Sequence, residues 1–168
     1  GIRPVDVPVF LAAQLLGALS AALLFGWLVP GKIGRTSMKT VIFACVHNAG
    51  RSQMASAFFN AMANPDLARA VSAGTQPGPR VHPEVVEVMG EVGIDLAHAE
   101  PQLLSDELAR GADMLITMGC GDACPHVRGL QRDDWPLADP KGQPIDRVRE
   151  IREEIRARVE RLLARESW

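Results

Sequence analysis

The octapeptide Cys45-Val46-His47-Asn48-Ala49-Gly50-Arg51-Ser52 constrains the fold most, because it joins an apolar run directly to a helical pattern. The run before it, Thr40–Ala44, has the composition of a strand buried on both faces. The segment after it, Ser52–Ala63, repeats apolar residues at helical spacing. A tight loop between a strand and a helix turns backbone N–H groups and the helix N-terminus towards one point. We therefore predict an α/β fold with a site for a tetrahedral oxyanion.

Three side chains of this octapeptide have the chemistry of a catalytic site. The positive field of the loop favours the thiolate of Cys45, which is the reactive form of a cysteine. The planar guanidinium of Arg51 can pair with two oxygens of an anion, and Ser52 can donate a hydrogen bond to the thiolate. The alternative is a buried cysteine at a strand end with an unrelated surface arginine. Asn48 and Gly50 favour the anion loop, because both suit tight turns.

Strands and helices alternate along the rest of the sequence. The expected strands are Ala70–Ser72 and Met114–Met118, and the expected helices are Pro83–Val92, Asp106–Arg110 with Ser105 as its cap, and Asp146–Arg165, whose charges should form a solvated face. This alternation predicts a parallel sheet covered by helices on both faces. In a flavodoxin-like strand order the first and third strands are neighbours, and ligands bind at their carboxyl ends. The loops that hold Cys45 and Cys120 should therefore lie side by side.

Two further cysteines, Cys120 and Cys124, follow the third expected strand. They are four residues apart, which on a helical turn places their Cα atoms about 6 Å from each other, within reach of a disulfide. Beside a nucleophilic thiol, such a pair is suited to passing an oxidising equivalent along a chain of thiols. Two inert buried thiols are one alternative. A zinc site that includes His126 is another, but the four ligands and spacing of such sites are missing, and we expect no metal.

A carboxylate is expected at the rim of the oxyanion site. Asp139 lies in a loop between Trp135-Pro136-Leu137-Ala138 and Pro140-Lys141-Gly142, which places its carboxylate at the rim of the site. Three other acids are expected to be solvated or capping residues: Asp122, Asp133 and Asp134. The net charge of −2, without a basic stripe interleaved with aromatic residues, gives no indication of nucleic-acid binding.

Together these motifs resemble those of arsenate reductases built on the low-molecular-weight tyrosine phosphatase fold. In family order they are Cys45–Ser52 with Gln53-Met54-Ala55, then Ser72-Ala73-Gly74, Gly93-Ile94-Asp95, the Met118–Pro125 loop and the Trp135–Pro140 loop. The resemblance runs from Met38 to the C-terminal helix. It implies a four-stranded parallel sheet in a three-layer, flavodoxin-like α/β fold.

The resemblance also implies a role for each reactive residue. Cys45 would attack arsenate held by the loop and Arg51, and Asp139 would protonate the departing oxygen. Cys120 would then attack Cys45 and release arsenite, and Cys124 would complete a Cys120–Cys124 disulfide. No bound cofactor is implied, because an external thiol system reduces this disulfide: thioredoxin, or mycothiol with mycoredoxin.

Departures from the family pattern keep three alternatives open. Phosphatases of this fold typically carry a tyrosine where this sequence has Lys141, and the chain contains no tyrosine. Ser56 stands where several thioredoxin-coupled reductases have an acid, and His47 and Gly50 also differ, in a way that resembles actinobacterial reductases, some of which use mycothiol. The alternatives are a tyrosine phosphatase, an arsenate–mycothiol transferase and a thiol-based sensor.

The sequence before Met38 has a different composition. Residues 7–31 carry no charge, and the apolar stretch Val9–Val29 is long enough to span a bilayer. Basic residues follow it, which indicates that the downstream side is cytoplasmic. A secretory signal would need a basic start and a cleavage site, and a buried core helix is a further alternative.

The first residues also resemble a known membrane segment. Gly1-Ile2-Arg3-Pro4 and the apolar stretch Pro8–Ala18 are similar to the last transmembrane helix of the aquaporin and glycerol-channel family, which implies an upstream channel domain. We therefore expect a transmembrane helix and linker over residues 1–37. A cytoplasmic, membrane-tethered arsenate reductase domain is expected over residues 38–168.

Overall fold

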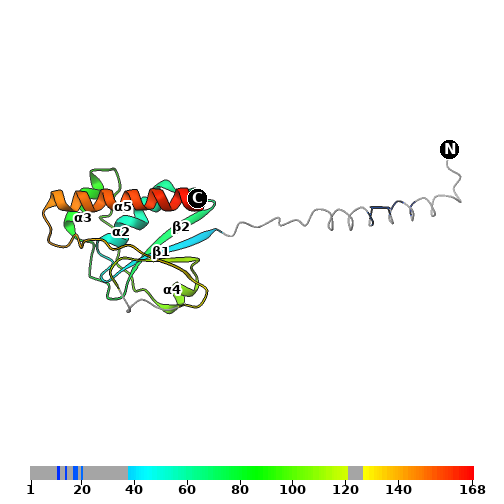
Figure 1. The fold of residues 1–168 in the computed structure, drawn as a ribbon, viewed down its shortest axis with the longest axis horizontal. Helices are drawn as coiled ribbons and strands as arrows, with labels where there is room; N and C mark the ends of the chain where they lie inside the picture. The colour runs from blue at the N-terminus through cyan, green and yellow to red at the C-terminus, as the bar shows by residue number, and fades with distance from the viewer. Residues whose placement is uncertain (1–10, 12–13, 15–16, 19, 21–37, 121–126) are drawn as a thin grey trace. The chain divides into compact units, whose positions relative to one another are not determined.

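The computed structural model describes residues 11, 14, 17–18, 20, 38–120 and 127–168 (Figure 1). The chain divides into two units, Gly1–Ser37 and Met38–Trp168. No helix in the described part of the chain is both long and apolar enough to cross a bilayer. The membrane segment expected over residues 7–31, and its likeness to a channel helix, lie for the most part outside the described residues.

The second unit contains one sheet of four parallel strands. The strands are β1 (Lys39–Cys45), β2 (Ala68–Gly74), β3 (Met114–Thr117) and β4 (Gln131–Asp134), arranged in the order β2-β1-β3-β4. At the carboxyl end Cys45 pairs with Gly74 and Ala44 pairs with Thr117. The predicted four-stranded parallel sheet is confirmed, and so is the pairing of the first and third strands.

Helices cover the two faces of the sheet unequally. They are α2 (Arg51–Met62), α3 (Pro83–Gly90), α4 (Asp106–Arg110) and α5 (Ile145–Glu166). One apolar cluster joins β1 and β3 to α2, α3 and α5, and a smaller one joins the opposite face to Leu104 and to Leu108 of α4 (Figure 1). The three layers expected from the sequence are therefore present.

The side chains of β1 alternate between these two clusters. Val41, Phe43 and Cys45 belong to the larger cluster, whereas Ile42 and Ala44 belong to the smaller one. All five are almost fully buried, as expected for a parallel strand covered on both faces. This alternation fixes the face of the sheet on which the Cys45 thiol lies.

The strand β4 has no counterpart among the strands expected from the sequence. All four of its residues are polar, and it lies at the edge of the sheet. Both of its acids also make hydrogen bonds within the protein. Asp134 accepts one from the Thr117 hydroxyl, and Asp133 accepts one from the Trp135 indole at 3.3 Å. Asp134 is exposed and Asp133 caps the next backbone N–H at 2.9 Å, as expected of solvated or capping acids, and their contacts to Thr117 and Trp135 are additional. Asp122 lies outside the described residues.

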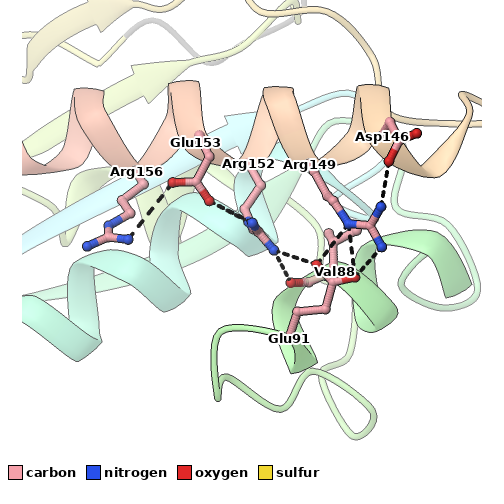
Figure 2. Close-up of polar contacts among 7 residues, drawn as sticks. All are labelled: Val88, Glu91, Asp146, Arg149, Arg152, Glu153 and Arg156. Carbon is pink, nitrogen blue, oxygen red and sulfur yellow. Dashed lines mark hydrogen bonds and ion pairs between the residues drawn. The ribbon is translucent and has the colours of Figure 1, made fainter.

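An ion-pair network joins α3 to α5. Figure 2 shows Glu91 between Arg149, at 2.6 Å, and Arg152, at 3.0 Å, with Arg152 also donating to the Val88 carbonyl at 2.7 Å. The hydrogen bonds from Arg149, and then from Arg152, hold the pKa of Glu91 below its ordinary range. The solvated face expected of the α5 charges is therefore incomplete, because Arg152 is buried and fastens the two helices together.

Candidate active site

The octapeptide forms the loop between β1 and α2, and its outer side is held by the segment that follows β2. Carbonyl oxygens of the loop accept hydrogen bonds from backbone N–H groups at 2.8–3.2 Å, in the pairs Cys45–Thr75, Val46–Gln76, His47–Gly78 and Ala49–His82. A trans peptide directs its C=O and the next N–H in opposite directions. The N–H groups that follow these carbonyls therefore turn to the inner side of the loop, where an anion can accept from them.

The Cys45 thiol lies at the floor of this loop. It is free and buried, and its Sγ accepts a hydrogen bond from the Asn48 backbone N–H at 3.2 Å. The Ser52 hydroxyl lies 3.0 Å from the same sulfur and accepts a hydrogen bond from the Asn48 side-chain amide at 2.8 Å. When Cys45 is a thiolate it can only accept, so the proton of the Ser52 hydroxyl is directed at it. The contact expected between Ser52 and Cys45 is present.

Asn48 fixes the turn of the loop from the inside. It is fully buried and has a left-handed backbone (φ 50°), a conformation that asparagine tolerates better than most residues. Its side-chain oxygen accepts from the Gln102 backbone N–H at 2.8 Å and from the Gln53 amide at 3.3 Å. Neither glutamine was identified as a site residue from the sequence. The position of Gln53 directly after the octapeptide is a usable signal in the sequence, whereas nothing in the sequence marks Gln102.

Gly74 allows the loop to approach β2 closely. A Cβ atom at this position would lie 2.7 Å from the Val46 carbonyl oxygen and 2.8 Å from the Asn48 nitrogen. These distances are too short for non-bonded contacts with backbone atoms, so no side chain fits without moving the loop. Steric exclusion of a side chain therefore explains why the Ser72-Ala73-Gly74 motif ends in glycine.

Arg51 joins the octapeptide to the loop before α5. It is the first residue of α2 and is 8% exposed. Its Nη2 lies 2.9 Å from Asp139 Oδ2, and its Nη1 donates to the Leu137 carbonyl at 3.0 Å. The structure thus brings Arg51 and Asp139 together at the mouth of the loop. Within the described residues the guanidinium is paired with the Asp139 carboxylate. An incoming oxyanion would compete with this carboxylate for the guanidinium.

Cys120 lies close to this site in the sheet but on its other face. It is disulfide-bonded and buried in the smaller cluster with Ile42 and Ala44, whereas Cys45 belongs to the larger cluster. The preceding Gly119 touches the site, because a Cβ there would lie 3.1 Å from Arg51 Nη1. The predicted adjacency of the two loops is therefore confirmed, but the Cys120 sulfur does not share the Cys45 cluster. Cys124 and His126 lie outside the described residues.

A metal site is not formed by the described part of the chain. No group of three or more His, Cys, Asp or Glu side chains within it is placed to hold a metal ion.

Comparisons with known proteins agree with this geometry. The family model for low molecular weight phosphotyrosine protein phosphatases matches residues 40–167. A putative arsenate reductase of Halobacterium salinarum is 42% identical over 121 residues, which are 70% of this chain and 85% of that protein. A glutaredoxin arsenate reductase of Synechocystis is 36% identical over 133 residues, covering 77% of this chain and all of the relative.

Solved structures give the same result. A thioredoxin-dependent arsenate reductase of Corynebacterium glutamicum has a TM-score of 0.63 and is 41% identical in sequence. The match covers 74% of this chain and 59% of that longer chain. An arsenate reductase in a phosphate-binding state has a TM-score of 0.66 and 34% identity, covering 76% of this chain and 98% of that one. With the cysteine loop, the sheet order and these similarities in agreement, the chain belongs to the low molecular weight phosphotyrosine protein phosphatase family, in which its relatives include arsenate reductases.

Proposed function

We propose that the protein reduces arsenate to arsenite at Cys45. The observation that carries the proposal is the contrast between two thiols at neighbouring strand ends, where Cys45 is free inside an anion loop and Cys120 is disulfide-bonded. A hydrolytic phosphatase needs only the first of these. Relatives named arsenate reductase at 30–42% identity support the same reaction.

In the first step arsenate binds to the inner N–H groups of the loop and to Arg51. Because Arg51 is paired with Asp139, the incoming anion replaces that carboxylate at the guanidinium. Asp139, released from Arg51, takes up a proton from the incoming arsenate or from solvent. The Cys45 thiolate then attacks arsenic, and Asp139 passes this proton to the oxygen that leaves as water. The product is an arsenic–sulfur bond on Cys45, with arsenic still in its +5 state.

In the second step the electrons come from cysteine sulfur. The Cys120 thiolate attacks the Cys45 sulfur, a Cys45–Cys120 disulfide forms, and the arsenic–sulfur bonding pair stays on arsenic, which leaves as arsenite. Cys124 then attacks the Cys120 sulfur and restores the Cys45 thiolate. Two thiols have lost two electrons, arsenic has gained two, and a Cys120–Cys124 disulfide remains for an external reductant.

This relay requires the segment after β3 to change position. Cys120 is buried on the face of the sheet opposite Cys45, so its sulfur must leave the smaller cluster before it can attack. Gly119 has φ +82°, a conformation natural to glycine, and is a suitable pivot directly before Cys120. We therefore assign the described conformation to the stage of the cycle after Cys120 has been oxidised.

The deciding experiment measures arsenate reduction by purified protein with thioredoxin, thioredoxin reductase and NADPH. Cys45→Ser should abolish arsenite production, and Cys120→Ser should stop turnover while still allowing the covalent Cys45 adduct, which mass spectrometry detects. Ser56→Ala is the matched control, because its hydroxyl binds only the Gln53 carbonyl within the described residues. Full thioredoxin-driven turnover by Cys120→Ser would exclude the relay.

The electron donor is a finer part of the proposal. Relatives are named for thioredoxin and for glutaredoxin, and the variant loop residues favour mycothiol with mycoredoxin as the alternative. Cys124→Ser separates them, because only the thioredoxin route needs an internal disulfide. Full activity of Cys124→Ser with mycothiol and mycoredoxin would identify an arsenate–mycothiol transferase.

Phosphate-ester hydrolysis is a second candidate, favoured by the family model that matches residues 40–167. A phosphatase would hydrolyse p-nitrophenyl phosphate rapidly when Cys120 and Cys124 are both replaced by serine. Slow hydrolysis together with fast arsenate reduction by the wild-type chain would assign the site to arsenate.

We also propose that residues 7–31 attach the protein to a membrane with the reductase unit on the cytoplasmic side. The support is the absence of charge over this length and the basic residues that follow it. Flotation of the full chain with lipid vesicles tests the proposal. Recovery of the full chain only in the vesicle-free fraction would contradict it.

A further inference from the structure

A second cavity adjoins the oxyanion loop where the segment that follows β2 packs against it. It has a volume of about 250 Å³ and is lined by residues of three segments: His47 and Ala49 of the octapeptide, Gly78–Pro83, and Lys141. The hydrogen bond from the His82 N–H to the Ala49 carbonyl, at 2.9 Å, fastens the second of these segments to the first. The cavity and the anion loop therefore share a wall.

The lining of this cavity is basic. Four of its side chains are basic, namely His47, Arg80, His82 and Lys141, and none of its described lining residues is an acid. Within the described part of the chain these four side chains make no hydrogen bond and no ion pair. Six of the seven arginines of α5 behave differently, since each pairs with a carboxylate: Arg147, Arg149, Arg152, Arg156, Arg158 and Arg165.

Two carboxylates that are close in sequence to this lining have other hydrogen-bond partners. Glu84 accepts the Gly142 backbone N–H at 3.0 Å, and Asp139 is paired with Arg51 and accepts the Lys141 backbone N–H at 3.1 Å. Neither carboxylate forms an ion pair with the basic side chains of the cavity, but Glu84 is close enough to interact electrostatically with His82. Unpaired basic groups of one sign around a concave surface concentrate anions there.

We propose that this cavity is a subsite for a second anionic group, a carboxylate or phosphate, on a small molecule whose other end reaches the anion loop. The proposal rests on the proposed function, in which that loop binds an oxyanion. Arsenate itself fills only the loop, so the subsite serves a larger ligand. Two sources have this chemistry: a phosphomonoester that carries a carboxylate, and a low-molecular-weight thiol that carries carboxylates and approaches the arsenic on Cys45.

The first arm of the test compares 3-phosphoglycerate with glycerol 3-phosphate, which lacks the carboxylate. Binding is measured by calorimetry on the full chain at low ionic strength, where exposed charges are least screened. Wild type should bind 3-phosphoglycerate more tightly, and the double variant Arg80→Gln/Lys141→Gln should lose that advantage by about three- to tenfold, as expected for two exposed ion pairs. Arg161→Gln is the matched control, because Arg161 is exposed and lines a cavity elsewhere on α5.

The second arm measures the KM for glutathione and for 2-mercaptoethanol as the reductant of arsenate. A rise in the KM for glutathione alone in the double variant identifies the thiol as the ligand, whereas an effect confined to the first arm identifies the ester. Equal behaviour of charged and uncharged ligands in both arms, or an equal effect of Arg161→Gln, overturns the subsite. Because the binding arm needs no arsenate, a failure of the reductase assay leaves its result intact.

Discussion

Arg51 Nη2 lies 2.9 Å from Asp139 Oδ2, a contact that joins the start of α2 to a loop 88 residues later in the chain. The same guanidinium donates to the Leu137 carbonyl, so it holds both the carboxylate and the backbone of that loop. An oxyanion that binds the Arg51 guanidinium in place of Asp139 therefore also frees the Asp139 carboxylate. In the proposed reaction, substrate binding and the placement of the proton donor are therefore coupled through one side chain.

Arg51→Lys should weaken both arsenate binding and the placement of Asp139. A lysine ammonium cannot reach Asp139 and the Leu137 carbonyl as a planar fork does. Hydrogen bonds to charged groups are worth about 1.5–3 kcal/mol, so kcat/KM for arsenate should fall about 10- to 100-fold. Steady-state kinetics checks this, with Arg161→Lys as the control. A loss below twofold would mean that Arg51 does not contact the substrate.

Ser52→Ala should slow the chemistry of Cys45 without unfolding the loop. The variant removes the hydroxyl 3.0 Å from Sγ and leaves the Asn48 N–H as the described donor to the sulfur. The rate of Cys45 alkylation by iodoacetamide at neutral pH should fall about 3- to 10-fold, as expected for one lost hydrogen bond. Ser56→Ala should react at the wild-type rate, and an equal loss in both variants would point to a general effect on α2.

Gly74→Ala should displace the anion loop. The added methyl group would lie 2.7 Å from the Val46 carbonyl oxygen and 2.8 Å from the Asn48 nitrogen. Overpacking of this kind costs about 1–3 kcal/mol, and phosphate binding measured by calorimetry should weaken as well. Gly90→Ala is the control, because a Cβ there meets nothing within 4 Å and should leave phosphate binding unchanged. Wild-type phosphate affinity in Gly74→Ala would show that the close approach is not required.

Glu91→Gln should destabilise the protein at neutral pH and much less in acid. Hydrogen bonds from Arg149 and Arg152 lower the pKa of Glu91, so its ionised form is favoured in the folded state. The stabilisation is present above the pKa of an unfolded glutamate, about 4.3, and is lost as pH falls through the lower folded value. Urea unfolding at pH 7 and pH 3 measures the change.

Glu87→Gln is the control for this pH dependence, because Glu87 lies on the same helix and its carboxylate makes no hydrogen bond or ion pair within the described residues. It should show little difference between the two pH values. A destabilisation of Glu91→Gln that stays constant between pH 7 and pH 3 would mean that the charge of Glu91 does not fasten α3 to α5.

The sequence was sufficient for the strand, loop and helix that hold Cys45, because each has a distinct local signal. Thr40–Ala44 is apolar throughout most of its length, the octapeptide contains the turn-forming Asn48 and Gly50, and α2 has helical spacing. The neighbouring positions of β1 and β3 follow from the flavodoxin-like strand order that the alternation of strands and helices predicts. These features depend on short stretches of chain and general topology, so one sequence is enough to predict them.

The parts that could not be predicted depend on contacts between distant segments. An edge strand made only of polar residues, β4, has no apolar pattern, and its pairing with β3 is what makes it a strand. The bond between Gln102 and Asn48 joins two loops 54 residues apart. Likewise, the face on which Cys120 is buried depends on the positive φ of Gly119, which spacing between cysteines does not reveal.

The carbonyl groups of the anion loop accept hydrogen bonds on its outer side, and this affects how the site can select between arsenate and phosphate. A loop whose shape is already fixed by Thr75, Gln76, Gly78 and His82 cannot adjust to the small difference in size between arsenate and phosphate. Its N–H groups meet four oxygens around a centre in either case. Phosphate should therefore compete with arsenate for the site, which inhibition kinetics with added phosphate would measure. Discrimination is left to the irreversible step, in which only arsenic accepts two electrons and departs.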